Sequence, residues 1–213
     1  MENYRGKFMK DKRFFWSNLI LLAFIAYFLS FGILFLIKKN SIAVDNLVAA
    51  FFCITFIFLN RRLKANPLVA FFAGLIFMPH AAGALGLYSS PLFNYHYDKF
   101  VHLTTAFLAV IVIMNAILNK KYNLNKFFIV SAIAFCIVIT FGAFVEVIEY
   151  WGFRAFGFGE GYLGFGSGDN SKNFGPWEDS SLDNTFNIAG SLIGIMAYAG
   201  YILIKRHSGS VSK

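Results

Sequence analysis

The sequence predicts an all-helical integral membrane protein, a bundle of about six transmembrane helices with both termini in the cytoplasm. Hydrophobic residues make up 58% of the 213 residues and charged residues only 14%, whereas a soluble domain is about one-quarter charged. The apolar residues gather in runs of about 20, the length that crosses a bilayer as a helix. The basic residues lie mostly on one side of these runs.

Six apolar runs are the predicted spans. The first run is too long for the apolar region of a signal peptide and lacks a small-residue cleavage site, so we expect it to be retained. The second is the weakest, because Asp45 and Asn46 lie near its start. In chain order the runs cover residues 14–37, about 42–59, about 67–88, about 100–118, 127 to about 151, and about 183–204.

The net charge of +8 reflects membrane topology rather than binding to nucleic acid. With the N-terminus inside, the inner segments hold 14 of the 19 lysines and arginines. This positive-inside bias places both termini in the cytoplasm. No basic groove interleaved with aromatic residues is visible, so nucleic acid is not an expected partner. Cys53 and Cys136 lie inside spans, where they are expected to act as small apolar residues.

A single membrane domain is expected over residues 14–204, between a basic cytoplasmic segment, 1–13, and a cytoplasmic tail, 205–213. Membrane lipids are the expected surroundings. The one long loop, about 152–182, holds 8 of the 18 glycines. It is either a flexible connector or an aromatic-bearing lid over a site, because long loops in compact domains are often functional.

The acidic residues gather on the predicted outer side, which holds nine of the eleven. Asp98 and His102 are four residues apart and therefore share a helix face. Glu146 and Glu149 are three apart near the outer end of the fifth span. Carboxylates at a helix C-terminus oppose the helix dipole, and charges at membrane depth usually face the protein interior. This pair therefore indicates a polar site.

A third group belongs to the start of the last span. Asp179, Asp183 and Asn187 follow one another at intervals of four and share a face if the helix begins near Asp179. Taken alone, the two acids are equally well explained by the positive end of the helix dipole. His80, in the outer half of the third run, is either a hydrogen-bonded core residue or a further member of the site.

Clustered carboxylates with imidazole suit a divalent metal ion, and zinc, manganese or magnesium is the expected cofactor. The alternative is a cluster without metal, partly protonated, which would suit a proton relay. The predicted metal ligands are Asp98, His102, Glu149 and Asp183, with His80 as a further ligand. The predicted general base is Glu146 or Asp179, and the other polar candidates are Asn187, Glu178 and Asp169.

The same residues, in order, resemble those of YjdF-type bacterial inner-membrane proteins, which look like distant relatives of VanZ-like proteins. The matching strings include "PHAAGALGLY", "YDKFVH", "FVEVIEYWG" and "WEDSSLD", within about Pro79 to Gly194. The D-K-x-x-H motif falls on Asp98, Lys99 and His102, the mid-chain glutamate on Glu146 and Glu149, and the late D-x-x-x-N-x-x-G on Asp183, Asn187 and Gly190.

One departure from the family pattern is the insertion "NSKNFGP" between Asp169 and Trp177. It leaves the role of Asp169 open, and also the choice between Glu178 and Asp179. The resemblance implies a polytopic protein of the cell envelope, because VanZ-like proteins are linked to glycopeptide tolerance. It supplies no reaction.

Three functions remain open from the sequence, and whether the chain is an enzyme stays undecided. The first is metal-dependent hydrolysis or transfer on a lipid or lipid-linked substrate at the outer face of the cell membrane. The second is ion- or proton-coupled transport, against which stands the scarcity of polar groups at mid-membrane. The third is a structural or assembly role, in which the cluster only fixes helix packing.

Overall fold

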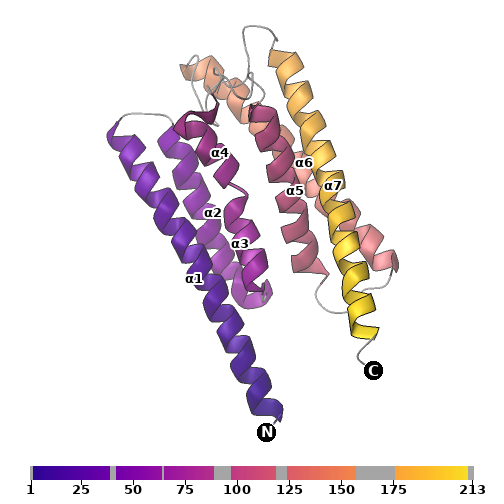
Figure 1. Ribbon diagram of the computed structural model, residues 1–213. Helices are drawn as coiled ribbons and strands as arrows, with labels where there is room; N and C mark the ends of the chain where they lie inside the picture. Colours follow the sequence, from indigo (N-terminus) through magenta and orange to yellow (C-terminus); the bar gives the residue numbers. More distant parts are fainter. Residues whose placement is uncertain are drawn as a thin grey trace.

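A computed structural model describes residues 2–38, 42–63, 65–88, 97–118, 124–156 and 176–210. These residues contain helices and no strand (Figure 1). The chain begins and ends at the same end of the bundle (Figure 1). The helices are α1 (Glu2–Ile37), α2 (Ile42–Leu63), α3 (Pro67–Leu75), α4 (Met78–Ala82), the π-helix η1 (Gly83–Leu87), α5 (Tyr97–Ile117), α6 (Leu124–Phe156) and α7 (Pro176–Ser210).

Five of these helices are long and apolar enough to cross a membrane. They contain or overlap the first, second, fourth, fifth and sixth predicted spans. Their outer surfaces carry large apolar side chains, such as Phe58, Ile204 and Ile37, which are 68%, 70% and 74% exposed. Apolar patches of this extent mark contact with a membrane or a partner. The membrane class predicted from the sequence is therefore supported.

The third predicted span, 67–88, is not a continuous helix. Asn66 caps α3 by accepting a hydrogen bond from the amide of Val69 at 2.9 Å, but α3 ends at Leu75. Pro79, four residues later, has no amide hydrogen, and its ring would clash with the Leu75 carbonyl in an unbroken helix. Gly86, inside η1, has φ 120°, which only glycine adopts readily. The segment therefore divides into α3, α4 and η1.

The predicted loop at 152–182 is shorter in the structure, because helix extends into it from both ends. The sixth predicted span begins not at Asp183 but at Pro176, the first residue of α7. Proline suits the first turn of a helix, since its missing amide hydrogen is not needed there. The acids Glu178 and Asp179 follow in that turn, where the helix dipole favours them. Residues 157–175, including Asp169, lie outside the described residues.

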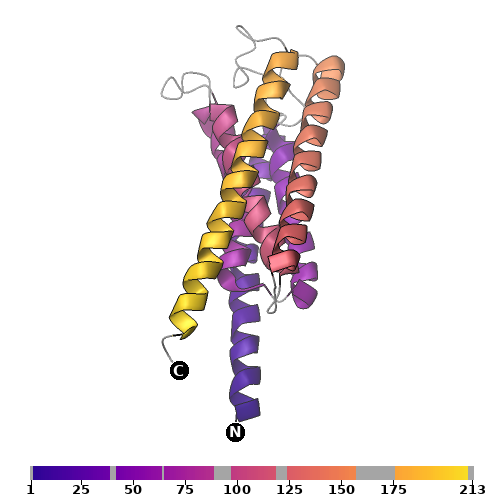
Figure 2. The same ribbon diagram turned by 90° about the vertical axis from the view of Figure 1, so that its right-hand side faces the viewer.

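The most extensive helix interfaces are between α5 and α7 and between α1 and α2. Glycines bring α7 close to α5: a Cβ on Gly190 would lie 2.1 Å from the carbonyl oxygen of Leu103. A Cβ on Gly194 would lie 2.8 Å from that of Phe107. This G-x-x-x-G spacing permits close backbone contact between membrane helices. Figure 2 shows α7 beside α6 along the bundle.

Candidate functional site

Three helices bring polar side chains together at the end of the bundle opposite the chain termini. α5 and α7 begin at that end and α6 finishes there (Figure 1). Seven residues from these three helices form what we call the polar cluster. All but His102, which is part-buried, are at least nine-tenths buried. The cluster consists of Asp98, Lys99 and His102 from α5, Glu146 from α6, and Asp179, Asp183 and Asn187 from α7.

Lys99 lies at the centre of the acids. Its Nζ donates to Oδ1 of Asp179 at 2.5 Å, to Oδ1 of Asp183 at 2.6 Å and to Oδ2 of Asp98 at 3.2 Å. Only 4% of Lys99 is exposed. A charge-assisted hydrogen bond is about twice as strong as a neutral one. Lys99 therefore links the first turn of α5 to the first turns of α7.

His102 lies beside Lys99 and faces the same carboxylates. Its Nδ1 is 3.3 Å from Oδ1 of Asn187. If Nδ1 carries the proton, it donates to that oxygen, and the other nitrogen is directed at the acids. Nε2 lies 3.7 Å from Oδ2 of Asp98, 3.7 Å from Oε1 of Glu146 and 3.8 Å from Oδ1 of Asp183. The i, i+4 spacing of Asp98 and His102 thus does place them on one face, as predicted.

The charges within the polar cluster do not balance. The cluster holds four carboxylates and one lysine, so with all groups ionised and His102 neutral the formal charge is −3. A charged side chain at membrane depth costs about 2.5–3.5 kcal/mol even on the milder scales. The cluster therefore requires a further cation, or protons on some of its carboxylates.

The geometry offers a place for that cation. Asp98, His102 and Asp183 each present one ligand atom, and these atoms lie within 4.8 Å of one another. Ligands around a tetrahedral ion with bonds of about 2.0–2.1 Å stand roughly 3.3–3.4 Å apart. The distances from His102 Nε2 to the oxygens of Asp98 and Asp183, 3.7 and 3.8 Å, are a few tenths of an ångström longer. Glu146 Oε1 is the nearest fourth ligand.

Lys99 restricts this site, because it uses the same oxygen atoms. Oδ2 of Asp98 and Oδ1 of Asp183 already accept hydrogen bonds from its ammonium group. A carboxylate oxygen has more than one lone pair. Each of these two oxygens could therefore bind a cation on the side facing His102 while it keeps its hydrogen bond to Lys99. Alternatively, the cation replaces Lys99 as its partner.

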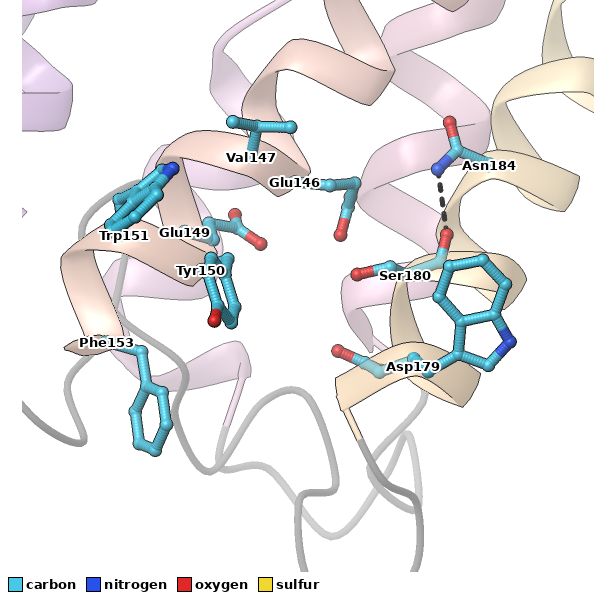
Figure 3. Close-up of a pocket in the computed structure, with 10 residues that line it drawn as sticks. Glu146, Val147, Glu149, Tyr150, Trp151, Phe153, Asp179, Ser180 and Asn184 are labelled. Atoms are coloured by element: carbon cyan, nitrogen blue, oxygen red, sulfur yellow. Dashed lines mark hydrogen bonds between the residues drawn. The ribbon is translucent and has the colours of Figure 1, made fainter.

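A cleft of about 570 Å³ adjoins the polar cluster, between the end of α6 and the start of α7. Figure 3 shows the side chains of Glu146, Asp179 and Ser180 facing the space between the two helices. Asn184 lies at the same wall and donates a hydrogen bond to the Ser180 carbonyl at 2.9 Å. Glu149, a predicted metal ligand, is half-buried and lines this cleft instead of joining the three-residue ligand group.

The remaining predicted residues lie elsewhere. Glu178 is exposed on α7 and does not line the cleft. His80 belongs to a second buried group: its Nε2 lies 3.2 Å from Oδ2 of Asp45 on α2, and its Nδ1 lies 2.6 Å from the hydroxyl of Tyr88. The structure thus shows two groups: His80 on α4 lies in this α2–α4 group with Asp45 and Tyr88, rather than among the described contacts of the polar cluster.

A family model described as "Predicted membrane protein (DUF2238)" matches residues 17–206. The chain belongs to this family. The match covers every polar-cluster residue as well as Asp45, His80 and Tyr88 of the second group. No curated protein and no solved structure matches the chain.

Sequence reasoning missed the central role of Lys99 in this DUF2238 protein. Lys99 directly follows Asp98 in the sequence and therefore lies about 100° from it around the helix. Spacings of three and four residues, which identify a shared face, do not include Lys99. Its lysine stem is long enough to reach back to the acids. The available signal was a lysine next to an acid at the start of an apolar run. Asp45, which weakens the second predicted span and counts among the nine outer acids, pairs with His80, a contact that the sequence did not predict.

Proposed function

We propose that this DUF2238 protein binds a divalent cation between Asp98, His102 and Asp183. We further propose that it uses this site for hydrolysis or transfer on a lipid or lipid-linked substrate. The supporting observation is the excess of buried carboxylates over positive charge around Lys99. Zinc, manganese and magnesium are the candidate ions, because two carboxylates with one imidazole suit them best.

Each residue of the polar cluster has a part in this proposal. A cation at this site would polarise a phosphoryl or carbonyl oxygen of the substrate. Asn187 holds Nδ1 of His102, which leaves Nε2 for the ligand position. Lys99 reduces the repulsion between Asp98, Asp179 and Asp183. Glu146 and Asp179 line the cleft and are the candidate proton acceptors.

The proposed location of the site is the extracytoplasmic face of the cell membrane. Fourteen of the 19 basic residues lie in the segments on the side of the termini, which the positive-inside rule assigns to the cytoplasm. The polar cluster lies at the other end of the bundle (Figure 1). The resemblance of the chain's ordered motifs to those of YjdF-type inner-membrane proteins is a further reason to propose a function in the cell envelope.

Ion- or proton-coupled transport is the second candidate, and the broken segment 67–88 favours it. Carriers often place their ion sites at discontinuous membrane helices. The second group, Asp45 with His80, lies against this break. A carrier would move protons or cations across vesicles without changing any lipid, so flux and lipid chemistry distinguish the two candidates.

The test is a turnover assay with the full chain in vesicles of defined phospholipids, each supplied in turn with zinc, manganese or magnesium. Lipid products are measured by mass spectrometry. We expect products with the wild type, at least a hundredfold fewer with Glu146→Gln, and wild-type levels with Glu178→Gln. Glu178 is the matched control, because it is an exposed acid outside the cleft.

Equal product from the wild type, Glu146→Gln and Asp179→Asn would contradict the enzyme proposal, because these are the two candidate proton acceptors. Ion flux that depends on the polar cluster, with every lipid unchanged, would establish the carrier instead. A protein that tolerates Glu146→Gln and Glu149→Gln in every assay, with a change only in stability, would support the structural role.

A further inference from the structure

The cleft between α6 and α7 has walls of two kinds. Aromatic side chains form one part of the lining. They are also exposed on the surface of the bundle: Tyr150 is 50% exposed, Trp151 63% and Trp177 85%. Exposed tryptophan and tyrosine are typical of the level where a bilayer meets water. The cleft thus adjoins the outer surface of the helix bundle where lipid headgroups would lie.

The polar part of the cleft is acidic. Glu146, Glu149 and Asp179 line it, and no lysine, arginine or histidine does so among the described residues. Figure 3 shows Glu149 and Tyr150 on α6 facing the same space as Asp179 on α7. An anionic headgroup would meet repulsion at these walls. A cation would meet both carboxylates and aromatic rings along these walls, and aromatic rings attract ammonium groups.

Glu146 is a separate indication that the cleft binds a positively charged ligand. It is 8% exposed and lines the cleft, yet its Oε1 has no hydrogen-bond partner among the described residues. The basic side chain within 4 Å of it is His102, whose Nε2 lies at 3.7 Å. Lys99 pairs with the three aspartates and not with Glu146. A buried carboxylate oxygen without a donor is costly.

We propose that the α6–α7 cleft takes a lipid with a positively charged amine in its headgroup, entering sideways from the bilayer. This rests on the proposed function in taking a lipid as the substrate, and it names the class of that lipid. The ammonium group lies against Glu149 and the aromatic rings, within reach of Glu146. In an ethanolamine headgroup the phosphodiester, two carbons from the amine, is then the group presented to the polar cluster on the inner side of Glu146.

The experiment measures lipid retention by native mass spectrometry of the full chain in detergent. The protein is incubated with equal amounts of phosphatidylethanolamine and phosphatidylglycerol that carry the same acyl chains, with and without chelator. We expect a preference for the ethanolamine lipid of roughly tenfold or more, the scale of an ion pair combined with a cation–π contact. Soluble glycerophosphoethanolamine should bind far more weakly, because it has no acyl chains.

The variants divide into cleft and control positions. Glu149→Gln and Trp177→Ala should each reduce the preference to within about twofold. Glu178→Gln and Trp16→Ala should leave it unchanged, since Glu178 lies outside the cleft and Trp16 is an exposed tryptophan on α1. Equal retention of both lipids by the wild type would overturn the proposal. So would tight binding of the soluble headgroup, or an equal loss in Trp16→Ala and Trp177→Ala.

The chelator separates this inference from the cation site. If the amine preference persists in chelator while no metal binds under any condition, the amine cleft stands and the cation proposal fails. If metal binds to the wild type but both lipids are retained equally, the amine cleft fails and the cation site stands.

Discussion

Nζ of Lys99 on α5 lies 2.5 Å from Oδ1 of Asp179 on α7, a contact between residues 80 positions apart in the sequence. It joins the first turns of two helices that also touch through Gly190 and Leu103 further into the bundle. The two contacts together fix the separation of α5 and α7. The candidate cation site depends on that separation, because its ligands come from both helices.

Lys99→Met should destabilise the fold strongly. The substitution keeps much of the apolar stem but leaves three buried aspartates without their shared partner. Removing one member of a buried ion-pair network costs about 3–5 kcal/mol. Thermal unfolding in detergent with chelator, against Lys38→Met at an exposed position, measures the effect. Equal unfolding temperatures for the two variants would show that Lys99 is not essential for compensating the acids.

Gly190→Ala should separate α5 from α7. The new Cβ would lie 2.1 Å from the Leu103 carbonyl oxygen, a backbone atom that cannot rotate away. Overpacking of this kind costs about 1–3 kcal/mol. The matched control is Gly200→Ala, since a Cβ there meets nothing within 4 Å and alanine is the better helix former. Unfolding temperatures check this, and an equally stable Gly190→Ala would argue against the close contact.

Asn187→Ala should weaken cation binding without abolishing it. Asn187 is not one of the proposed metal ligands, but its Oδ1 lies 3.3 Å from Nδ1 of His102 and orients the ring. Loss of such an orienting partner lowers metal affinity by roughly 10- to 100-fold. Calorimetric titration of zinc or manganese measures the change. Asn184→Ala, one turn earlier, should keep wild-type affinity because Asn184 bonds to its own helix; a similar loss there would mean a general disturbance of α7.

Tyr88→Phe tests the second buried group. The change removes the hydroxyl that lies 2.6 Å from Nδ1 of His80 and leaves the ring in place. Loss of a buried partner costs about 1–3 kcal/mol. Unfolding temperature reports the cost, and Tyr150→Phe, at a half-exposed ring, provides the comparison. If the two variants unfold alike, the hydroxyl contributes little to the α2–α4 group.

Hydropathy predicted the five long helices because long apolar runs can satisfy their backbone groups in lipid only as helices. It failed at 67–88, where the run as a whole is apolar but Pro79 and Gly86 break the backbone pattern. It also began the last span too late, since Asp179 and Asp183 count as polar although both are buried in α7. Apolar content predicts whether a segment inserts into lipid, but it does not predict the residue at which a helix begins.

Spacing along one helix predicted that Asp98 and His102 share a face of α5, because i, i+4 residues do so whatever surrounds them. The approach of Asp183 on α7 to these two residues depends on helix packing. Spacing also could not assign His80 to a neighbour. His80 lies at the same end of the bundle as the polar cluster but next to α2, and which helices adjoin within the membrane is a property of packing. The contacts of Lys99 could not be predicted for the same reason, since its partners on α7 are 80 and 84 positions away in the sequence.

The most direct test of the cation site is the metal content of three versions of the full chain: wild type, His102→Ala and His80→Ala. The two histidines are a matched pair, because the side chains of His102 and His80 are 11% and 12% exposed and each lies near a carboxylate. After supply of zinc, manganese and magnesium, we expect about one divalent ion per chain in wild type and His80→Ala. His102→Ala should bind none. Metal retained in His102→Ala, or absent from all three proteins, would contradict the account.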